Sequence, residues 1–505
     1  MGTAPHGRDP LVAGHCEDVA DALSLQPRPE LGVLPVCLVR GDPPRGQSRL
    51  DGTLKHPQAQ HGFRGESDAA SDAGFLTASS VVAPAAGQIQ LPVDGKASQT
   101  NEYDAASDLT HPAVAMTDST VGRFEAEYDA DGQFVREEWP NGVLVTAQVN
   151  EAGTTVGLTY DKPGCGSANC VLYADSVLPS AHGQWRERQS TISGQRLAHD
   201  DAGRLLSVRD TVGSQCETRT YAYDGSTNRT GVSAYAPAAG GACQETVVSA
   251  SREWEFDTAD RASGGYSHDT LGRAVTVPSV DSPTVAEGNI SLSYYSSDLV
   301  RSISNASGQT EYTVDVMGDR VRSWTTTGSG GSGSGTHHYA CDGDSPVWTA
   351  EGAGRWTRTV TGLAGTAGIW DSVSGGTWKL ANLHGDFVAT IPEGQSTPSA
   401  THEATEFGMT RSGTTADQRY GYLGAYQRAT DPTAGLTLMG VRLYNPVSGR
   451  FLQVDPLVGG SANPYEYAGG DPFINLDTDG RAWKCEIQCN LEGMGGKSVS
   501  QVAVG

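Results

Sequence analysis

The amino-acid sequence predicts an all-β protein built from short strands and tight turns. Glycine contributes 64 of the 505 residues and hydrophobic residues 37%, a composition that suits a turn-rich β protein better than a helical bundle. Apolar and polar residues alternate in short runs, such as residues 291–294 and 357–360, as they do in strands with one face in water. A turn motif also recurs along much of the chain. These features together predict hairpins stacked into one extended structure.

Residues 1–110 form the first segment, and its composition does not favour a packed core. The segment is rich in Gly, Pro, Ser and charged residues and has little apolar periodicity. Such a segment buries too little apolar surface to offset the conformational entropy that folding removes. We therefore expect a poorly ordered N-terminal segment. Its first residues lack a basic start followed by an apolar run, so they form no recognisable secretion signal.

Residues 111–400 form the second segment, which carries the recurrent turn motif aromatic–Asp–x–x–Gly–Arg–aliphatic. The better instances and their looser variants begin at Tyr128, His199, Tyr223, Phe256, His268 and Val314. In such a unit the Asp caps the turn through the backbone, the Gly supplies a positive φ, and the Arg and the aliphatic residue start the return strand. Each hairpin must stack on its neighbours to bury its apolar face. The glycine-rich run 328–335 is expected to be a flexible loop or linker between repeats.

Residues 401–481 form the third segment, which is organised around the stretch 421–480. Its aromatic and aliphatic positions are interrupted by Gly, Pro and Asn every few residues, a pattern of short strands and obligatory turns. Asp431, Asp455 and Asp471 each precede a proline. Because an Asp before Pro is held out of the helical region, each of these carboxylates is expected in a turn.

This third segment resembles the RHS-repeat-associated core domain of Rhs, WapA-type and insecticidal toxin-complex C proteins. Residues 440–451 fit the family pattern GxRxYxPxxGRF, residues 455–456 its following DP, and residues 459–467 its GG…NPYxY. The recurrent turn motif is similar to the YD repeat of the same family. The resemblance implies YD-repeat hairpins that wind into a β-cocoon shell closed by the RHS core domain. Family shells are usually longer, which implies a partial cocoon or part of a larger protein.

The resemblance also implies a site of self-cleavage. Arg442, Asp455 and Asp477 match the positions to which the family's intramolecular aspartyl protease activity is attributed, and the cut would separate Arg481 from Ala482. Two close carboxyl groups cannot both ionise cheaply, so one keeps a proton and polarises the scissile carbonyl while the other activates water. The arginine can hold one carboxylate as the anion. The chain would then be at most a single-turnover autoprotease.

A structural alternative remains open for the same residues. Asp-Pro and Asp-x-x-Gly are ordinary turn sequences, and Arg442 also suits a structural ion pair. Two positions depart from the family pattern, since Thr478 replaces the Pro of DPxG and Arg481 replaces the Leu after which family members are cut.

Composition limits the classes of partner. A formal charge of −24 repels phosphate backbones, so we expect no nucleic-acid binding. No run of about 18 apolar residues predicts a membrane span, and scattered histidines predict neither a metal site nor a cofactor. Among nine cysteines, the pairs Cys165–Cys170 and Cys216–Cys243 are close enough in sequence for local disulfides, with unpaired thiols as the alternative. Local pairs favour an extracellular or cell-surface location.

Residues 482–505 form a short variable tail, with too few residues to bury a core of their own. The resemblance implies a scaffold that encapsulates and presents a C-terminal toxin in bacterial competition, with its own C-terminal segment as cargo and an immunity protein as a partner. A non-enzymatic module that binds cell-surface glycans is one alternative. An inert, truncated remnant of a larger Rhs or WapA-type protein is the other.

Overall fold

The computed structural model describes residues 88–93, 95–103, 113–163, 170–315, 317–329, 331–340, 343–411 and 419–485. Most of the expected N-terminal segment 1–110 and most of the tail 482–505 lie outside these ranges. Within them the chain is almost entirely β, which confirms the predicted fold class. The helices in these ranges are short 3₁₀ helices: η3 (Ser279–Asp281), η4 (Val285–Glu287), η5 (Gly424–Tyr426) and η6 (Ala468–Gly470). None of the described helices is long and apolar enough to cross a membrane.

Two large sheets contain most of the strands, and every strand in them pairs antiparallel with its neighbour in the sequence. The first sheet has 14 strands: β1 (Gln88–Val93), β2 (Ala97–Glu102), β3 (Ala115–Asp118), β4 (Gly122–Tyr128), β5 (Phe134–Glu138), β6 (Leu144–Val149), β7 (Thr155–Asp161), β8 (Val171–Pro179), β9 (Trp185–Ser190), β10 (Ser193–His199), β11 (Leu205–Val212), β12 (Gln215–Tyr223), β13 (Arg229–Tyr235) and β14 (Val248–Glu253). The second sheet has 13 strands: β15 (Ser267–His268), β16 (Ala274–Val277), β17 (Ile290–Tyr294), β18 (Val300–Asn305), β19 (Gly308–Asp315), β20 (Arg320–Gly328), β21 (Gly333–Tyr339), β22 (Pro346–Ala350), β23 (Trp356–Gly362), β24 (Gly365–Asp371), β25 (Gly375–Ala381), β26 (Phe387–Pro392) and β27 (Ala400–Thr401). We call these two sheets together the shell.

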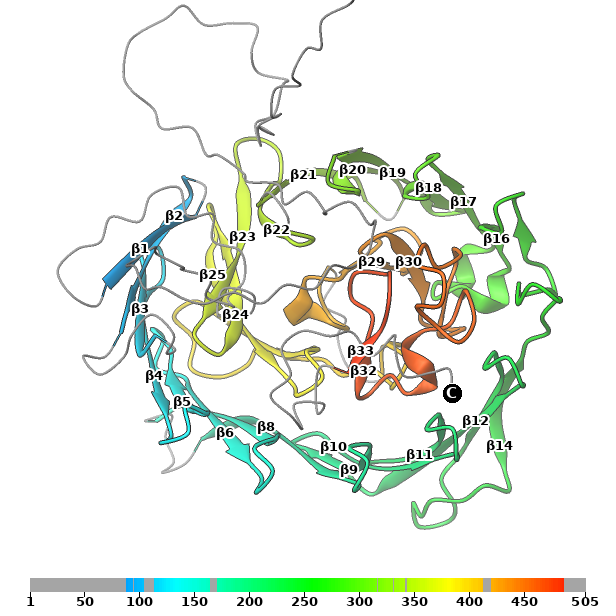
Figure 1. The fold of residues 1–505 in the computed structure, drawn as a ribbon, viewed down its shortest axis with the longest axis horizontal. Coiled ribbons are helices and arrows are strands. Elements are labelled where there is room, and N and C mark those ends of the chain that lie inside the picture. The colour runs from blue at the N-terminus through cyan, green and yellow to red at the C-terminus, as the bar shows by residue number, and fades with distance from the viewer. Residues whose placement is uncertain are drawn as a thin grey trace, which may run out of the picture.

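The shell winds into a ring whose two ends meet, as Figure 1 shows. There β23–β25 lie beside β1–β5, and a shared apolar cluster fills the seam. Its members from the first sheet include Phe124, Trp139 and Val145, and those from the second sheet include Val360, Trp378 and Leu380. A buried ion pair, 2.6 Å between Arg358 and Asp118, joins the same two ends. The seam therefore closes the ring by side-chain packing, although β1 and β27 belong to different sheets.

The recurrent motif builds its turns as the sequence predicted. In the instance at Asp200, Oδ1 accepts hydrogen bonds from the amides of Ala202 at 3.0 Å and Arg204 at 2.9 Å. Gly203 has a φ of 86°, which a residue with a Cβ rarely adopts. Leu205 then starts β11.

The Arg of each motif also reaches the next turn of the shell. Arg204 Nη1 donates to the carbonyl of Asp224 at 3.1 Å, and its guanidinium lies 4.8 Å from the ring of Tyr223. The hydroxyl of Tyr223 donates back to the carbonyl of Leu205 at 3.0 Å. The same contacts recur between Arg273 and the Tyr294–Tyr295 turn and between Arg320 and the Tyr339–Ala340 turn. These charge-assisted and cation–π contacts couple consecutive hairpins, which a single hairpin sequence does not reveal.

The glycine-rich run 328–335 corrects one expectation. Its first residue ends β20 and its last three residues begin β21, so only its middle serves as the turn. Gly335 pairs with Trp324, whose ring occupies the space that a Cβ on Gly335 would take. The indole therefore covers the glycine and supports a strand that glycine alone would weaken.

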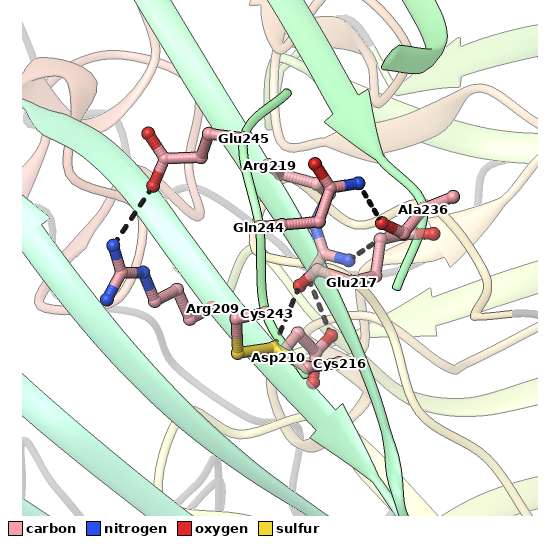
Figure 2. The surroundings of a disulfide bond; sticks show 9 residues. All are labelled: Arg209, Asp210, Cys216, Glu217, Arg219, Ala236, Cys243, Gln244 and Glu245. Atoms are coloured by element: carbon pink, nitrogen blue, oxygen red, sulfur yellow. Dashed lines mark hydrogen bonds and ion pairs between the residues drawn. A yellow bond between two sulfur atoms is a disulfide. The ribbon is translucent and has the colours of Figure 1, made fainter. Parts of the chain in front are cut away.

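One disulfide joins Cys216 on β12 to Cys243 in the loop before β14, with 4.8 Å between the Cα atoms. This confirms the predicted local pair. Figure 2 shows it beside two ion pairs, Arg209 with Glu245 and Arg219 with Asp210. The other predicted pair includes Cys165, which lies outside the described residues.

The last described stretch, residues 419–485, forms two small sheets inside the ring (Figure 1), and we call it the inner segment. Its strands are β28 (Ala429–Thr430), β29 (Thr437–Met439), β30 (Arg442–Asn445), β31 (Arg450–Phe451), β32 (Asn475–Leu476) and β33 (Lys484–Cys485). A buried cluster that includes Tyr422, Met439, Tyr444, Phe451, Tyr467 and Leu476 holds it together. Hydrogen bonds from Asn445 to Asp281 and from Tyr465 to Gly272 attach it to the shell.

Candidate functional site

The three residues predicted to form a site lie together in the inner segment. Arg442 is only 2% exposed. Its Nη2 lies 2.6 Å from Asp477 Oδ2 and 3.2 Å from Asp455 Oδ2. Because both carboxylate oxygens contact one nitrogen, they are at most about 6 Å apart. The side chains of all three residues are almost completely buried, so this cluster is a desolvated one.

Local structure explains how each residue reaches this corner. Arg442 is the first residue of β30, directly after a tight turn from β29. Asp455 lies in a turn beyond β31, where its Oδ1 accepts the amide of Leu457 at 2.8 Å and its Oδ2 accepts the hydroxyl of Ser461 at 3.1 Å. Asp477 directly follows β32. The turn that the Asp-Pro pair predicted therefore aims one carboxylate at the arginine.

The surroundings of Arg442 fix its guanidinium. It lies 3.6 Å from the ring centroid of Phe451, and Nη1 donates to the carbonyl of Pro464 at 3.3 Å. Burial lowers the pKa of Arg442, while the charges of Asp477 and Asp455 oppose that shift. The arginine thus holds both carboxylates from one side without access to bulk water.

Burial also acts on Asp477. It raises the pKa of this carboxyl to about 6, against the opposing charge of Arg442, and the nearby Asp479 and Asp455 carboxylates add to the rise. A carboxyl with this pKa binds a proton far more readily than an exposed aspartate does. The site therefore suits two carboxyl groups that share one proton.

The peptide bond between Arg481 and Ala482 lies against the same carboxyl groups. The Arg481 amide donates to Asp477 Oδ1 at 3.0 Å. A Cβ placed on Gly460 would lie 2.9 Å from the Arg481 carbonyl oxygen and 3.3 Å from Asp455 Oδ2, so these two oxygens are at most about 6 Å apart. That separation is enough for a water molecule between them. The residue before the expected cut is therefore held by one aspartate on its amide side and lies near the other on its carbonyl side.

Two glycines allow the chain before this bond to approach so closely. A Cβ on Gly440 would lie 2.1 Å from the carbonyl oxygen of Asp479, and a Cβ on Gly480 would lie 2.4 Å from that of Met439. Both glycines have positive φ, 55° and 68°. The amide of Val441 then donates to the Asp479 carbonyl at 3.1 Å. The sequence analysis assigned no role to Gly440, Gly480, Gly460 or Ser461, although the glycines of GVR and DTDG could have indicated a close backbone approach.

Two cavities between the shell and the inner segment flank the site. One, of about 340 Å³, is lined in part by Gly440, Val441 and Arg481. The other, of about 530 Å³, is lined in part by Thr478. In the described ranges no group of three or more His, Cys, Asp or Glu side chains is arranged to hold a metal ion.

Comparisons with known proteins agree on the fold. No protein-family model matches the chain. Salivary gland surface protein 1 of Aedes aegypti is 45% identical over 51 residues, which are 10% of this chain and 2% of that protein. A TcdB2–TccC3 crystal structure without its hypervariable C-terminal region matches 78% of this chain and 23% of its own chain, with a TM-score of 0.54 and 15% identity. A Photorhabdus luminescens Tc holotoxin pore, with a substitution in TccC3, covers 80% of this chain and 22% of its own at a TM-score of 0.52 and 15% identity.

These likenesses concern architecture, since the identities are low and the chain spans less than a quarter of the length of the solved chains that it matches. The neighbours belong to the toxin-complex class that the sequence motifs resemble. The ring of stacked hairpins and the inner segment within it thus have the fold of an RHS-type scaffold, as found in part of the TcdB2–TccC3 chains.

Proposed function

We propose that this chain is an RHS-type shell that encloses its own C-terminal segment and cuts itself once, between Arg481 and Ala482. One observation carries the proposal. The peptide bond in question lies beside two buried carboxyl groups that share Arg442, inside a ring of strands. A structural ion pair would need the arginine and the aspartates, but it would not require the chain after Asp477 to return to the same corner.

The proposed reaction is hydrolysis by a carboxyl pair. The ionised member takes a proton from water as the oxygen attacks the carbonyl carbon of Arg481. The protonated member gives its proton to the carbonyl oxygen, and collapse of the tetrahedral species returns a proton to the departing nitrogen of Ala482. Asp455 lies on the carbonyl side and Asp477 on the amide side, and the two titrate as a pair. Because the substrate is part of the same chain, its position replaces a binding step.

Cleavage at this bond would not by itself release the tail. Beyond the bond, β33 pairs with β32 in the register Leu476 with Lys484 and Asn475 with Cys485. These backbone hydrogen bonds would keep the new N-terminus at Ala482 attached to the inner segment. A cut chain would therefore remain associated until the shell opens or unfolds.

We propose the same division of labour that the sequence suggested. Residues 111–400 supply the shell, residues 401–481 close it and cut the chain, and residues 482–505 are the segment presented as cargo. The likeness to a TcdB2–TccC3 structure described without a hypervariable C-terminal region supports this division. We further propose an extracellular role in bacterial competition, with an immunity protein as a partner. The Cys216–Cys243 disulfide supports an oxidising location.

Mass spectrometry of the purified full-length chain under denaturing conditions tests self-cleavage. The wild type should give two products that meet between Arg481 and Ala482, while Asp455→Asn and Asp477→Asn should each give one intact chain. Asp131→Asn, an exposed turn aspartate far from the site in sequence, is the matched control and should be cut like the wild type. Denaturing conditions matter because the pairing of β32 with β33 would hide a cut under native conditions. An intact wild-type chain would reject the proposal.

A further inference from the structure

The side chain of Arg481 has a partner on the shell that the carboxyl pair does not require. Its Nη2 lies 3.0 Å from Asp319 Oδ2. We propose that Asp319 is a positioning residue, an acidic subsite that holds a basic side chain at the position before the cut and so sets the specificity of the cleavage. This inference rests on the proposed function, since it concerns the same bond.

Asp319 is present because one repeat of the shell departs from the pattern. In the turns at Gly203–Arg204 and Gly272–Arg273 the arginine directly follows the glycine. In the turn between β19 and β20, Asp319 is inserted between Gly318 and Arg320. It has a φ of 49°, in the left-handed region that aspartate tolerates better than most residues do. The insertion thus places an extra carboxylate at the tip of this turn.

The other charged groups of this turn are engaged elsewhere. Arg320 contacts Asp315 at 3.2 Å and lies 4.2 Å from the ring centroid of Tyr339, as the motif arginines of the other repeats do. The Asp319 carboxylate therefore faces the inner segment and meets Arg481 there. Among the residues that depart from the expected pattern, one in the shell and one at the cut are thus opposite charges in contact.

These contacts hold Arg481 at two points. Its amide donates to Asp477 Oδ1 and to Asp479 Oδ1, both at 3.0 Å, while its guanidinium binds the shell. The side chain runs along the cavity of about 340 Å³, whose lining includes Asp319 and Val441. A leucine at position 481 would leave the Asp319 carboxylate without this cation. The geometry thus points to a subsite for Arg or Lys, with Arg favoured by its longer reach and planar donors.

The size of the effect follows from exposure. The side chains of Arg481 and Asp319 are 36% and 49% exposed, so water and salt screen the pair. An exposed ion pair changes an equilibrium by about two- to fivefold. We therefore expect Asp319→Ala to slow cleavage by about threefold, and Asp319→Arg, which adds repulsion, by about tenfold. The loss in Asp319→Ala should shrink in 1 M salt, which a purely structural role would not predict.

The first experiment follows cleavage of full-length chains made by cell-free synthesis, after translation is stopped. Asp319→Arg and Arg481→Asp should each slow the first-order appearance of the fragment, and the double variant should recover most of the wild-type rate. Asp319→Glu should stay close to the wild type, and Asp131→Arg is the control for an exposed turn charge. Equal rates for the wild type, Asp319→Arg and Asp319→Ala would overturn the subsite while leaving self-cleavage intact.

The second experiment does not depend on self-cleavage. In the Asp455→Asn chain, trypsin can cut after Arg481 only when that side chain leaves its partner. Adding Asp319→Ala should raise the rate of this tryptic cut about threefold, the same factor as above, and adding Asp131→Ala should leave it unchanged. An uncut wild type would reject the proposed function, and this trypsin result would still decide whether Asp319 holds Arg481. No change with Asp319→Ala would overturn the contact itself.

Discussion

Replacing Arg442 with methionine removes one charge from the centre of the candidate site while keeping a side chain that is long and flexible. The two carboxylates that it contacts, at 2.6 and 3.2 Å, would remain buried without a cation. Removing one partner of a buried ion pair costs about 3–5 kcal/mol, because the remaining charge is left desolvated. We expect a loss of this size in the free energy of unfolding of Arg442→Met at pH 8.

The sign of the pH dependence follows from the carboxyl groups. Burial already raises the pKa of Asp477 to about 6 in the presence of Arg442, and removal of the cation raises it further. A carboxyl with a folded-state pKa above its unfolded value destabilises the fold once the pH exceeds the unfolded value. This penalty disappears as the pH falls and the folded carboxyl takes up its proton. The loss in Arg442→Met should therefore be about 2 kcal/mol smaller at pH 5 than at pH 8.

Urea denaturation at both pH values measures this difference. The matched control is Arg196→Met, which breaks a surface pair of 3.4 Å whose side chains are 75% and 51% exposed. The control should lose less than about 1 kcal/mol at either pH. If Arg442→Met were no less stable than Arg196→Met, or if its loss were the same at pH 5 and pH 8, the account of a buried, proton-sharing carboxyl pair would be wrong.

Three further predictions follow from the same contacts. The rate of self-cleavage should fall as the pH rises through about 6, because Asp477 then loses the proton that the pair shares; a rate rising above pH 7 would contradict this. Gly440→Ala should prevent cleavage and destabilise the inner segment by about 2 kcal/mol or more, since its Cβ would lie 2.1 Å from the Asp479 carbonyl and its φ is 55°; a mass spectrum like that of the wild type would refute it. Replacing Cys216 and Cys243 together with serine should lower the free energy of unfolding by about 3 kcal/mol, measured against the oxidised wild type, and unchanged stability would show that the disulfide constrains little.

Local sequence was enough to predict the hairpins of this protein. In the turn at Asp200 every group that shapes the turn lies within four residues, from the capping carboxylate to Gly203 and Arg204. Such a unit reads the same wherever it occurs, so its repetition predicted both the strands and their stacking. The same reasoning predicted a turn at Asp455, whose carboxylate accepts the amide two residues later.

The candidate site was predictable in membership and not in arrangement. The motif resemblance singled out Arg442, Asp455 and Asp477, and the structure brings them together. It did not single out Gly440 or Gly460, because a glycine needed for close approach looks in sequence like any turn glycine. Their role depends on which backbone lies opposite, and that backbone comes from another part of the inner segment.

The sequence by itself determined the all-β class, the form of each turn and the residues of the candidate site. The tertiary structure alone decided that Asp118 meets Arg358 across 240 residues and that Asp319 meets Arg481 across 162. Each strand adds a small twist to its neighbour, and only the sum of many such steps sets where the ring closes and which turn faces the inner segment. No local pattern contains that sum, so partners far apart in the chain emerge only from the folded shell.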